Sequence, residues 1–311
     1  PDQYDVTLFL FSPVGEYMDD IPKQVHIISC GSLFRCLGTS QKECSHNLGR
    51  YFLRGVFAVI CKLFGRKAVM PLLLRSQKKL ATHYDCAISY LQNGDPHHFY
   101  GGVNEFVLHK VDAERKIAFL HCDYMQCGAN CEANNADYKK FDLIAACSDG
   151  CRDSFIRALP ELSKKCRTVP NFHRYSEIRT LAQKSPYIYD PESLHIVMVG
   201  RLAHEKGIDR ALHAVDHARK QGIPAILHLV GDGPTGAALR SLACELGLED
   251  AVKFHGQQNN PYRFMTYADL LLITSWHEAA PMVIDEAYAL SLPVLTVETT
   301  SSEEMVAKRG C

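Results

Sequence analysis

The strongest constraint on the fold is the stretch from Trp276 to Pro293, because it lies between two short apolar runs. The runs at residues 269–275 and 293–297 have the length and composition of buried parallel β-strands. The residues between them therefore form a turn and one helix. Pro281 suits the first position of this helix, where its fixed φ fits and its missing N–H loses no partner.

Two carboxylates flank this turn. Glu278 lies in the loop, and Glu286 lies about one helical turn past the start of the helix. Free backbone amides here point out of the carboxyl end of the strand, where the helix dipole stabilises an anion. This anion-binding stretch consists of Ala279, Ala280, Pro281, Met282 and Val283. The amides can hold a diphosphate, and the carboxylates can accept hydrogen bonds from hydroxyl groups, so the pattern indicates an activated sugar.

Glu278 and Glu286, separated by seven residues and with Pro281 between them, resemble the donor-site signature of retaining glycosyltransferases of family 4, which have the GT-B fold. The resemblance implies that the first glutamate contacts the donor sugar and the second contacts the ribose. Ala279 and Ser291 depart from the family pattern, in which Gly is usual at both positions. The alternative is that the two glutamates are solvated charges near a helix end.

A second cluster follows the apolar strand at residues 195–199. Gly200 and Arg201 lie at the carboxyl end of that strand and Lys206 lies at the start of the next helix, so both cations can converge on the cleft that holds Glu278. There they would neutralise a departing diphosphate. The Gly-Arg-Leu-x3-Lys-Gly pattern again resembles family 4, whose Arg and Lys do this work. The alternative, surface cations at a helix start, is disfavoured because the helix dipole repels them.

The sequence contains no Asp-x-Asp motif, and a metal-free site needs protein cations in the metal's place. We therefore expect no metal and no cofactor, with a UDP-, GDP- or ADP-sugar as donor substrate. The loop from Gly231 to Gly236 formally matches the dinucleotide-binding fingerprint, but the next strand ends at Gly256 without the acidic residue that would bind a ribose. The loop from Gly256 to Tyr262 resembles the family loop that flanks the nucleotide base.

The chain of 311 residues is long enough for two domains. Short apolar strands alternate with helices in both halves, which predicts two α/β, Rossmann-like domains with doubly wound parallel sheets that face each other across a cleft, as in the GT-B fold. We expect an acceptor-side domain at residues 1–172, a linker at 173–193 and a donor-binding domain at 194–311. Both ends look cut, because the resemblance predicts a further βα unit before the first domain and further helices after the second.

The first domain offers one candidate site residue. The strands expected there lie at residues 6–11, 25–29, 85–90, 116–121, 142–147 and 167–169. His121 ends one of them, and the resemblance places a His here near the donor sugar. The alternative is a structural, semi-buried His. Ser148 follows another strand in a pattern that faintly resembles a hydrolase nucleophile elbow, but the first Gly of that motif is missing.

The net charge and the cysteines limit which binding partners and which cellular compartment we expect. A formal net charge of −1 gives no general attraction to nucleic acid, so we expect no nucleic-acid partner. The 13 cysteines are scattered, and neither a signal peptide nor a membrane-spanning run is apparent, which favours a reduced, cytoplasmic compartment. Cys122, Cys127 and Cys131 beside His121 match neither a zinc nor an iron–sulfur spacing.

The segment 50–79 stands apart because it holds eight Lys and Arg residues within a longer stretch, 45–84, that has no Asp or Glu. Apolar residues run among these charges at helical spacing. Two interpretations remain: a helix that lies on an anionic membrane surface, or a core helix with a basic outer face. The resemblance favours the membrane, since many such transferases act on lipid-linked acceptors, and would place the protein on the inner face of the bacterial cytoplasmic membrane.

These patterns together predict a retaining, metal-independent glycosyltransferase that moves a sugar from a nucleotide diphosphate to a glycan or lipid-linked acceptor. The segments 84–90 and 116–123 resemble bacterial surface-polysaccharide transferases of this family. Two alternatives remain open. One is a nucleotide-sugar epimerase or a phosphorylase with the same fold, and the other is a non-catalytic sugar-nucleotide binding module.

Overall fold

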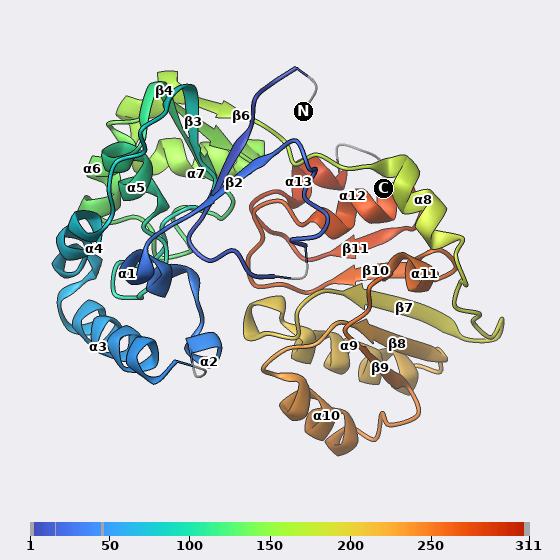
Figure 1. Ribbon diagram of the computed structural model, residues 1–311. Coiled ribbons are helices and arrows are strands. Elements are labelled where there is room, and N and C mark those ends of the chain that lie inside the picture. The colour runs from blue at the N-terminus through green and yellow to red at the C-terminus, as the bar shows by residue number, and fades with distance from the viewer. Residues whose placement is uncertain (1–2, 16, 45–46, 308–311) are drawn as a thin grey trace. The chain divides into compact units, whose positions relative to one another are not determined.

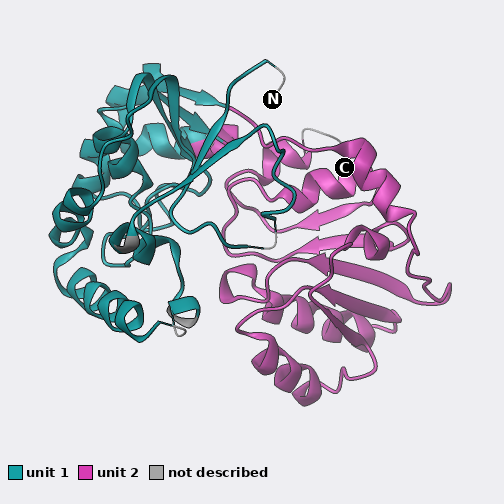
Figure 2. Cartoon of the chain, in the orientation of Figure 1, with its two compact units in different colours: residues 1–146, 152–168 teal, residues 147–151, 169–311 magenta. Residues whose placement is uncertain are grey.

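The computed structural model describes residues 3–15, 17–44 and 47–307, and the chain divides into two compact units (Figure 2). The first unit comprises residues 1–146 and 152–168, and the second comprises residues 147–151 and 169–311. The expected linker at residues 173–193 groups with the second unit and contains a helix, α8 (Tyr175–Ala182). Each unit has its own parallel sheet and is described by itself.

The first unit is built on a four-stranded parallel sheet with the order β3-β4-β5-β6. Its strands are β3 (His83–Ser89), β4 (Asp112–Leu120), β5 (Leu143–Ala146) and β6 (Cys166–Thr168). The helices between them are α5 (Val103–Lys110), α6 (Glu132–Tyr138) and α7 (Asp149–Ala158). The strands expected from residue 85 onward are therefore present, and they alternate with helices as the sequence predicts.

The two N-terminal strands differ from expectation. β1 (Thr7–Leu10) and β2 (His26–Ser29) pair in parallel, but they form a separate two-stranded sheet (Figure 1). The sequence pattern predicts a single sheet for all these strands, because apolar content locates a strand without specifying its neighbour. Consequently the described part of the first unit has two separate sheets, with β1 and β3 among their edge strands, where one continuous sheet was expected.

Four helices follow β2 and pack on the same unit. They are α1 (Ser32–Arg35), α2 (Gln41–Cys44), α3 (Leu48–Phe64) and α4 (Met70–Ser76). Asn47 caps α3, since its side chain accepts a hydrogen bond from the Arg50 N–H, and Gly65 ends the helix with φ of 77°. Phe57 and Leu73 bury one side of α3 and α4 in an apolar cluster that includes Phe106 of α5. Short 3-10 helices lie at Cys36–Gly38, Arg66–Ala68, Pro160–Lys165 and His204–Lys206.

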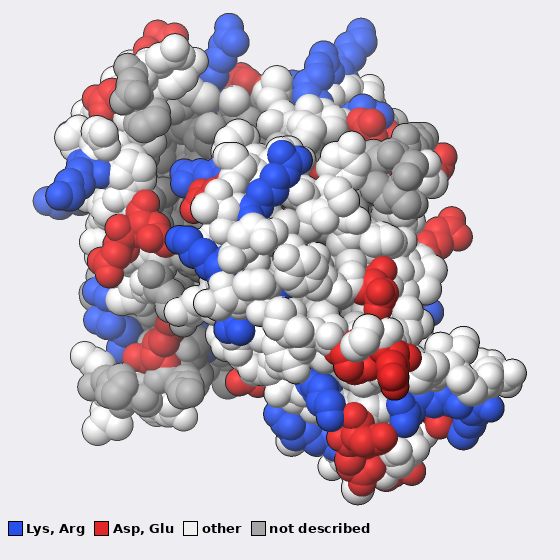
Figure 3. All heavy atoms as spheres, turned by 90° about the vertical axis from the view of Figure 1, so that its right-hand side faces the viewer, with Lys and Arg blue, Asp and Glu red and all other residues white. Residues whose placement is uncertain are grey.

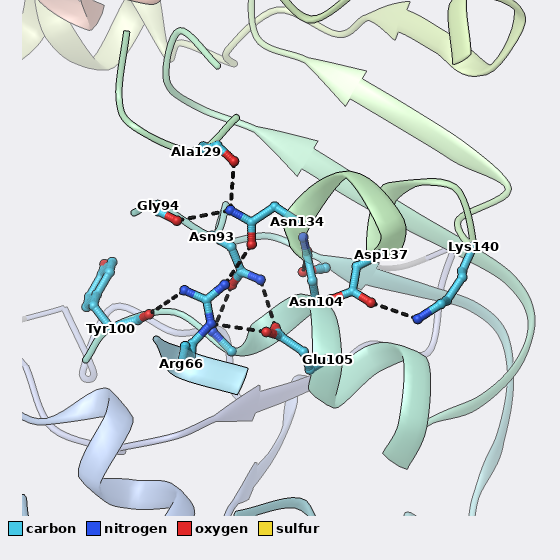
Figure 4. A network of polar contacts seen from close by, with 12 residues as sticks. Arg66, Asn93, Gly94, Tyr100, Asn104, Glu105, Ala129, Asn134, Asp137 and Lys140 are labelled. Atoms are coloured by element: carbon cyan, nitrogen blue, oxygen red, sulfur yellow. Dashed lines mark hydrogen bonds and ion pairs between the residues drawn. The ribbon is translucent and has the colours of Figure 1, made fainter. Parts of the chain in front are cut away.

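A buried polar network ties the loop after β3 to this helical layer (Figure 4). Arg66 is 2% exposed, and its guanidinium lies 3.1 Å from a Glu105 carboxylate oxygen and donates to Asn134 Oδ1 at 2.7 Å. Asn93 donates to the other Glu105 oxygen at 2.7 Å and accepts from the Gly102 N–H at 2.8 Å. Arg66 is one of the eight cations of the segment 50–79, but it does not belong to an exposed basic face, because it is buried and paired with Glu105 and Asn134.

The second unit contains a five-stranded parallel sheet with the order β11-β10-β7-β8-β9. Its strands are β7 (Leu194–Val199), β8 (Ala225–Val230), β9 (Val252–Gly256), β10 (Leu270–Ile273) and β11 (Val294–Thr296). Besides α8, its helices are α9 (Ile208–Lys220), α10 (Gly236–Glu245), α11 (Tyr262–Met265), α12 (Met282–Ala289) and α13 (Ser302–Met305). The strand order reverses between β7 and β10, so the topological switch point lies where these two strands end.

The alternation of side chains along β7 explains why both faces of this sheet are covered. Ile196 and Met198 point into a cluster with α9 and α10, whereas Val197 belongs to a cluster with α11, α12 and α13. Such two-sided burial accounts for the continuous apolar runs of these strands. On the face drawn in Figure 3, Lys and Arg side chains are interspersed with Asp and Glu side chains, in keeping with the net charge of −1.

Three histidines on neighbouring strands of the second unit form a hydrogen-bonded chain. His195 Nδ1 on β7 lies 3.0 Å from His228 Nε2 on β8, and His228 Nδ1 lies 3.0 Å from His255 Nε2 on β9. At the outer end, His195 Nε2 lies 2.9 Å from the Asp190 carbonyl oxygen. Burial, together with the neighbouring His255 and His195, lowers the pKa of His228 to about 3.

We expect this chain to make the second unit acid-sensitive. The folded pKa of His228 is about 3, below its unfolded value of roughly 6.5, so its stabilisation is complete above pH ~6.5 and is lost as the pH falls toward 3. In that window the wild type should lose up to ~1.4 kcal/mol per pH unit more than the variant His228→Phe. Urea denaturation at several pH values, followed by the fluorescence of the single tryptophan, Trp276, measures this difference. Equal pH slopes for both proteins would contradict it.

Candidate functional site

The carboxyl end of β7 is held by direct backbone packing. Gly200 follows the strand with φ of 152°, and its N–H donates to the Val230 carbonyl at 3.0 Å. A Cβ at Gly231 would overlap the Gly200 carbonyl, and a Cβ at Gly233 would overlap the backbone of Leu202. Gly231 and Gly233, two of the three glycines that mimic a dinucleotide fingerprint, are thus required here because two loops approach each other too closely for side chains.

Lys206 and Glu278 meet at the switch point, although they are far apart in sequence. Lys206 Nζ lies 2.6 Å from Glu278 Oε1, and Ser275 Oγ donates to the same oxygen at 2.7 Å. The Glu278 side chain is 13% exposed, which makes the pair only partly accessible to water. Gly207 has φ of 57°, and a Cβ there would overlap the Thr274 carbonyl, so this loop is fitted tightly against the end of β10.

Arg201 lies at the edge of this site. Its side chain is 67% exposed and forms an ion pair with Glu205. Arg201 nevertheless lines a small pocket of about 30 Å³ together with Lys206 and Glu278. Five residues proposed from the sequence line this pocket: Gly200, Arg201, Lys206, Glu278 and Val283.

The turn before α12 is close to expectation, with one shift. α12 begins at Met282, and Pro281 is its N-cap with extended backbone, so Pro281 does not occupy the first helical position. The residue before a helix commonly keeps extended backbone, and the fixed φ of −66° suits both positions. The carbonyls of Ala279 and Ala280 accept hydrogen bonds from Ser148 Oγ at 2.7 Å and from the Asn171 amide at 3.4 Å.

Glu286 lies inside α12 and is half-buried. Tyr262, at the start of α11, donates to Glu286 Oε1 at 3.4 Å. Burial raises the pKa of Glu286, the Tyr262 hydrogen bond opposes this rise, and the charge of Asp285 adds to it. Gly256, which begins the loop that leads to Tyr262, has φ of 67° and accepts from the Gly231 N–H at 2.8 Å. Glu286 and Gly256 do not line the small pocket.

Sequence reasoning missed a buried acidic group beside Glu286. Asp285 is 6% exposed; one of its oxygens lies 3.1 Å from His173 Nε2 and the other accepts from the Tyr175 hydroxyl at 3.2 Å. These contacts anchor α12 to the first residue of α8 and to the chain just before that helix. A second acidic residue next to Glu286 in a largely apolar helix was the signal in the sequence.

His121 directly follows β4 and belongs to the first unit, apart from the other candidate residues. Its ring stacks on Phe119 with centroids 4.6 Å apart, and Gln92 Oε1 accepts from the His121 N–H at 3.1 Å. Burial lowers the pKa of His121, although a hydrogen bond with the Tyr90 backbone opposes the shift. Its Nε2 is buried and has no hydrogen-bond partner among the described residues, so the ring keeps one polar atom available.

The cysteines near His121 show no metal-binding arrangement. In the part of the chain that the structure describes, no group of three or more His, Cys, Asp or Glu side chains could hold a metal ion. Cys127 instead accepts a hydrogen bond from the Gln92 amide at 3.2 Å. The expectation of a site without metal or cofactor stays a prediction.

Comparison with known proteins finds a family match within the second unit. Residues 183–310 match the family model described as glycosyl transferases group 1. This range contains all the candidate site residues except His121. LpsD of Rhizobium meliloti, a lipopolysaccharide core biosynthesis glycosyltransferase, is 36% identical over 100 residues, which cover 32% of this chain and 28% of the relative.

A second relative matches a longer stretch. The N-acetylgalactosamine-N,N'-diacetylbacillosaminyl-diphospho-undecaprenol 4-alpha-N-acetylgalactosaminyltransferase of Campylobacter jejuni is 29% identical over 164 residues, 53% of this chain and 43% of the relative. The matched stretch is therefore less than half of the length of either relative.

One solved structure resembles nearly the whole chain. Anabaena Alr3699/HepE in complex with UDP and glucose has a TM-score of 0.60 and 18% identity, over 96% of this chain and 75% of that chain. At this level of identity the likeness concerns the fold. It confirms the expected class, α/β with parallel sheets as in GT-B proteins.

Proposed function

Because residues 183–310 match the family model of glycosyl transferases group 1, we propose that this chain is a retaining, metal-independent glycosyltransferase of family 4. It transfers a sugar from a UDP-, GDP- or ADP-sugar to a glycan or a lipid-linked acceptor in bacterial cell-surface polysaccharide synthesis. The observation that carries the proposal is the Lys206–Glu278 pair of 2.6 Å at the switch point of the second unit. A cation and a carboxylate held together there suit a substrate with a diphosphate and sugar hydroxyls.

In this proposal each candidate residue has a separate task. Lys206, assisted by Arg201, stabilises the charge that develops on the leaving diphosphate. Glu278 accepts hydrogen bonds from the donor sugar, and Glu286 accepts them from the ribose. The resemblance to family 4 also assigns His121 a contact with the donor sugar. The amides that follow Ala279 bind phosphate oxygens at the start of α12.

Calorimetric titration of the purified chain with UDP, GDP and ADP in the presence of EDTA tests the donor site. The proposal expects saturable binding of one nucleotide without metal, and UDP is the first choice because Alr3699/HepE was solved with it. Loss of binding in EDTA would contradict the metal-free mechanism. Nucleotide release separates the alternatives: a transferase liberates the nucleotide when an acceptor is present, an epimerase interconverts donors without releasing it, and a non-catalytic module only binds.

We expect nucleotide affinity to depend on the ionisation of Glu286. The ionised carboxylate is the better acceptor for ribose hydroxyls, and burial raises the pKa of Glu286. Affinity should therefore fall on acidification at a higher pH than an ordinary glutamate would give, and Glu286→Gln should bind about tenfold more weakly at neutral pH. Titrations at several pH values check this. The same pH profile in Glu286→Gln would exclude Glu286 as the titrating group.

We also propose that α3 docks on an anionic membrane surface. The structure supports parts of both earlier interpretations: Phe57 and Cys61 are buried in the core, but another face of α3 is apolar and exposed. That face carries Phe52, Val56, Val59 and Leu63, which are 38–73% exposed and repeat at helical spacing. Lys62 and Lys67 lie exposed nearby, where they can meet lipid head groups. Among the described helices, none is long and apolar enough to cross a bilayer.

The double variant Phe52→Gln/Leu63→Gln should bind anionic vesicles at least about tenfold more weakly, because each large apolar side chain contributes roughly 1.5–3 kcal/mol when it is fully buried. Vesicle sedimentation at low and high salt measures the binding, and high salt should weaken that of the wild type. Ile188→Gln is the matched control, since Ile188 is 77% exposed and lies in the second unit. Equal binding of the wild type to neutral vesicles would overturn the proposal.

A further inference from the structure

Trp276 lies at the rim of the candidate site, in the loop that carries Glu278. It directly follows Ser275, whose hydroxyl donates to Glu278, and it is the single tryptophan of the chain. Trp276 is 54% exposed, and it does not line the small pocket that Lys206 and Glu278 share. A large aromatic side chain therefore stands in water beside the site.

The indole ring is held in one orientation. The Trp276 N–H donates to the Glu205 carbonyl at 3.0 Å. The ring centroid lies 4.5 Å from the guanidinium carbon of Arg210, which in turn donates to the Thr274 carbonyl at 3.1 Å. This cation–π contact covers one face of the ring. Because the residue remains half exposed, the opposite face is available to a ligand.

The sheet separates this ring from the proposed ribose site. Arg210 belongs to α9, which packs on the same face of the sheet as α10. Glu286 and its partner Tyr262 belong to α12 and α11, which pack on the other face. A nucleoside bound at Glu286 therefore lies away from Trp276. The donor sugar is tied to the diphosphate beside Lys206, so the rim is left to a second sugar.

We propose that the open face of Trp276 binds a pyranose ring of the acceptor, which makes the acceptor a glycan at its reacting end. This inference rests on the proposed function and narrows its substrate class. A pyranose has an apolar face of C–H groups and a rim of hydroxyls, so it can stack on the indole while its hydroxyls meet polar groups. The exposed ion pair of Arg201 and Glu205 adjoins this loop and offers both a donor and an acceptor. A plain hydrocarbon chain would leave that pair without hydroxyl partners.

Titration with methyl hexopyranosides tests this binding without turnover. Methyl β-glucoside, methyl β-galactoside and methyl N-acetyl-β-glucosaminide are added to the full chain, with and without UDP, while the fluorescence of Trp276 is recorded. We expect a saturable change with at least one pyranoside. Glucitol is the control, because it carries comparable hydroxyls on an open chain that has no ring face. No saturable change with any pyranoside, or an equal change with glucitol, would overturn the inference.

Saturation-transfer NMR titrations of the same pyranosides then compare variants. Trp276→Ala should weaken binding at least about tenfold, whereas Trp276→Phe should retain most of it, because a smaller ring still stacks. Tyr267→Ala is the matched control: Tyr267 is 53% exposed in the same unit, but it precedes the amino end of β10, whereas Trp276 follows the carboxyl end. Unchanged binding in Trp276→Ala, or an equal loss in Tyr267→Ala, would contradict the assignment.

Nucleotide measurements separate this inference from the proposed function. Trp276→Ala should leave the affinity for UDP unchanged, and a loss would place the ring against the nucleotide. Displacement of the pyranoside by UDP-glucose but not by UDP would place the donor sugar on the ring and would also overturn the inference. A chain that releases nucleotide to an acceptor without any pyranoside response would refute the inference alone. Pyranoside binding by a chain that binds no nucleotide would refute the transferase and leave a carbohydrate site at Trp276.

Discussion

Replacing Lys206 with methionine is expected to lower turnover by about 10²- to 10³-fold, because a single preorganised donor to a developing anion contributes that much. Lys206 Nζ already lies 2.6 Å from Glu278, so its ammonium is fixed at the candidate site before any ligand binds. Nucleotide release from the donor that the titrations select is the measurement. The fold should survive, since 32% of the Lys206 side chain is exposed.

The control for this prediction is Lys220→Met. Lys220 pairs with Asp216 at 2.7 Å on the surface of α9, and its loss should leave turnover unchanged. Arg201→Ala should lower turnover less than Lys206→Met does, because Arg201 is more exposed and shares its charge with Glu205. Near-normal turnover in an Arg201→Ala/Lys206→Ala double variant would refute the diphosphate clamp. Loss of turnover in Lys206→Met and its recovery in Lys206→Met/Glu278→Gln would indicate a different role for Lys206. Its ammonium would then neutralise Glu278 and would not stabilise the leaving diphosphate.

The second large effect concerns stability. Arg66→Met should destabilise the first unit by about 3–5 kcal/mol, because it leaves the Glu105 carboxylate buried without its cation. The Glu105 side chain is 12% exposed, and its oxygens contact Arg66 and Asn93. Hydrogen exchange of residues 90–105 measures this loss of stability. Tryptophan fluorescence does not serve here, because Trp276 lies in the second unit and reports on that unit.

Two comparisons separate a buried charge from simple loss of packing. Arg66→Met/Glu105→Gln should recover part of the stability, because the uncompensated charge is removed. Arg174→Met breaks an exposed pair with Glu177, and should cost at most about 1 kcal/mol. A cost below about 1 kcal/mol for Arg66→Met would mean that water reaches Glu105 and that the network is not buried in solution.

Local patterns in the sequence predicted much of this molecule. Every expected strand is present within a few residues, because apolar runs and turn residues act locally. The expected position of Glu286, inside a helix that follows an apolar strand, is also confirmed. The residue spacing around Lys206 and around Glu278 predicts that the two residues belong to one site. The reversal of strand order between β7 and β10 brings them together.

Other features depend on contacts that no local pattern encodes. The sequence did not reveal that β1 and β2 stand apart from the main sheet, because strand pairing is decided between segments distant in the chain. The burial of Arg66 was missed for the same reason: Glu105 and Asn134, which make it tolerable, come much later in the sequence. The contact of Asp285 with His173 likewise joins two residues more than a hundred positions apart.

The histidine chain across β7, β8 and β9 also fixes the positions of its protons. A neutral imidazole carries one N–H, so a carbonyl acceptor at Asp190 requires His195 to hold its proton on Nε2. His195 Nδ1 must then accept from His228 Nε2, and His228 Nδ1 must accept from His255 Nε2. All three rings therefore share one tautomer. If His195 held its proton on Nδ1 instead, His228 and His255 would both have to exchange tautomers, so a change of the acceptor at Asp190 would reach β9, two strands away from β7.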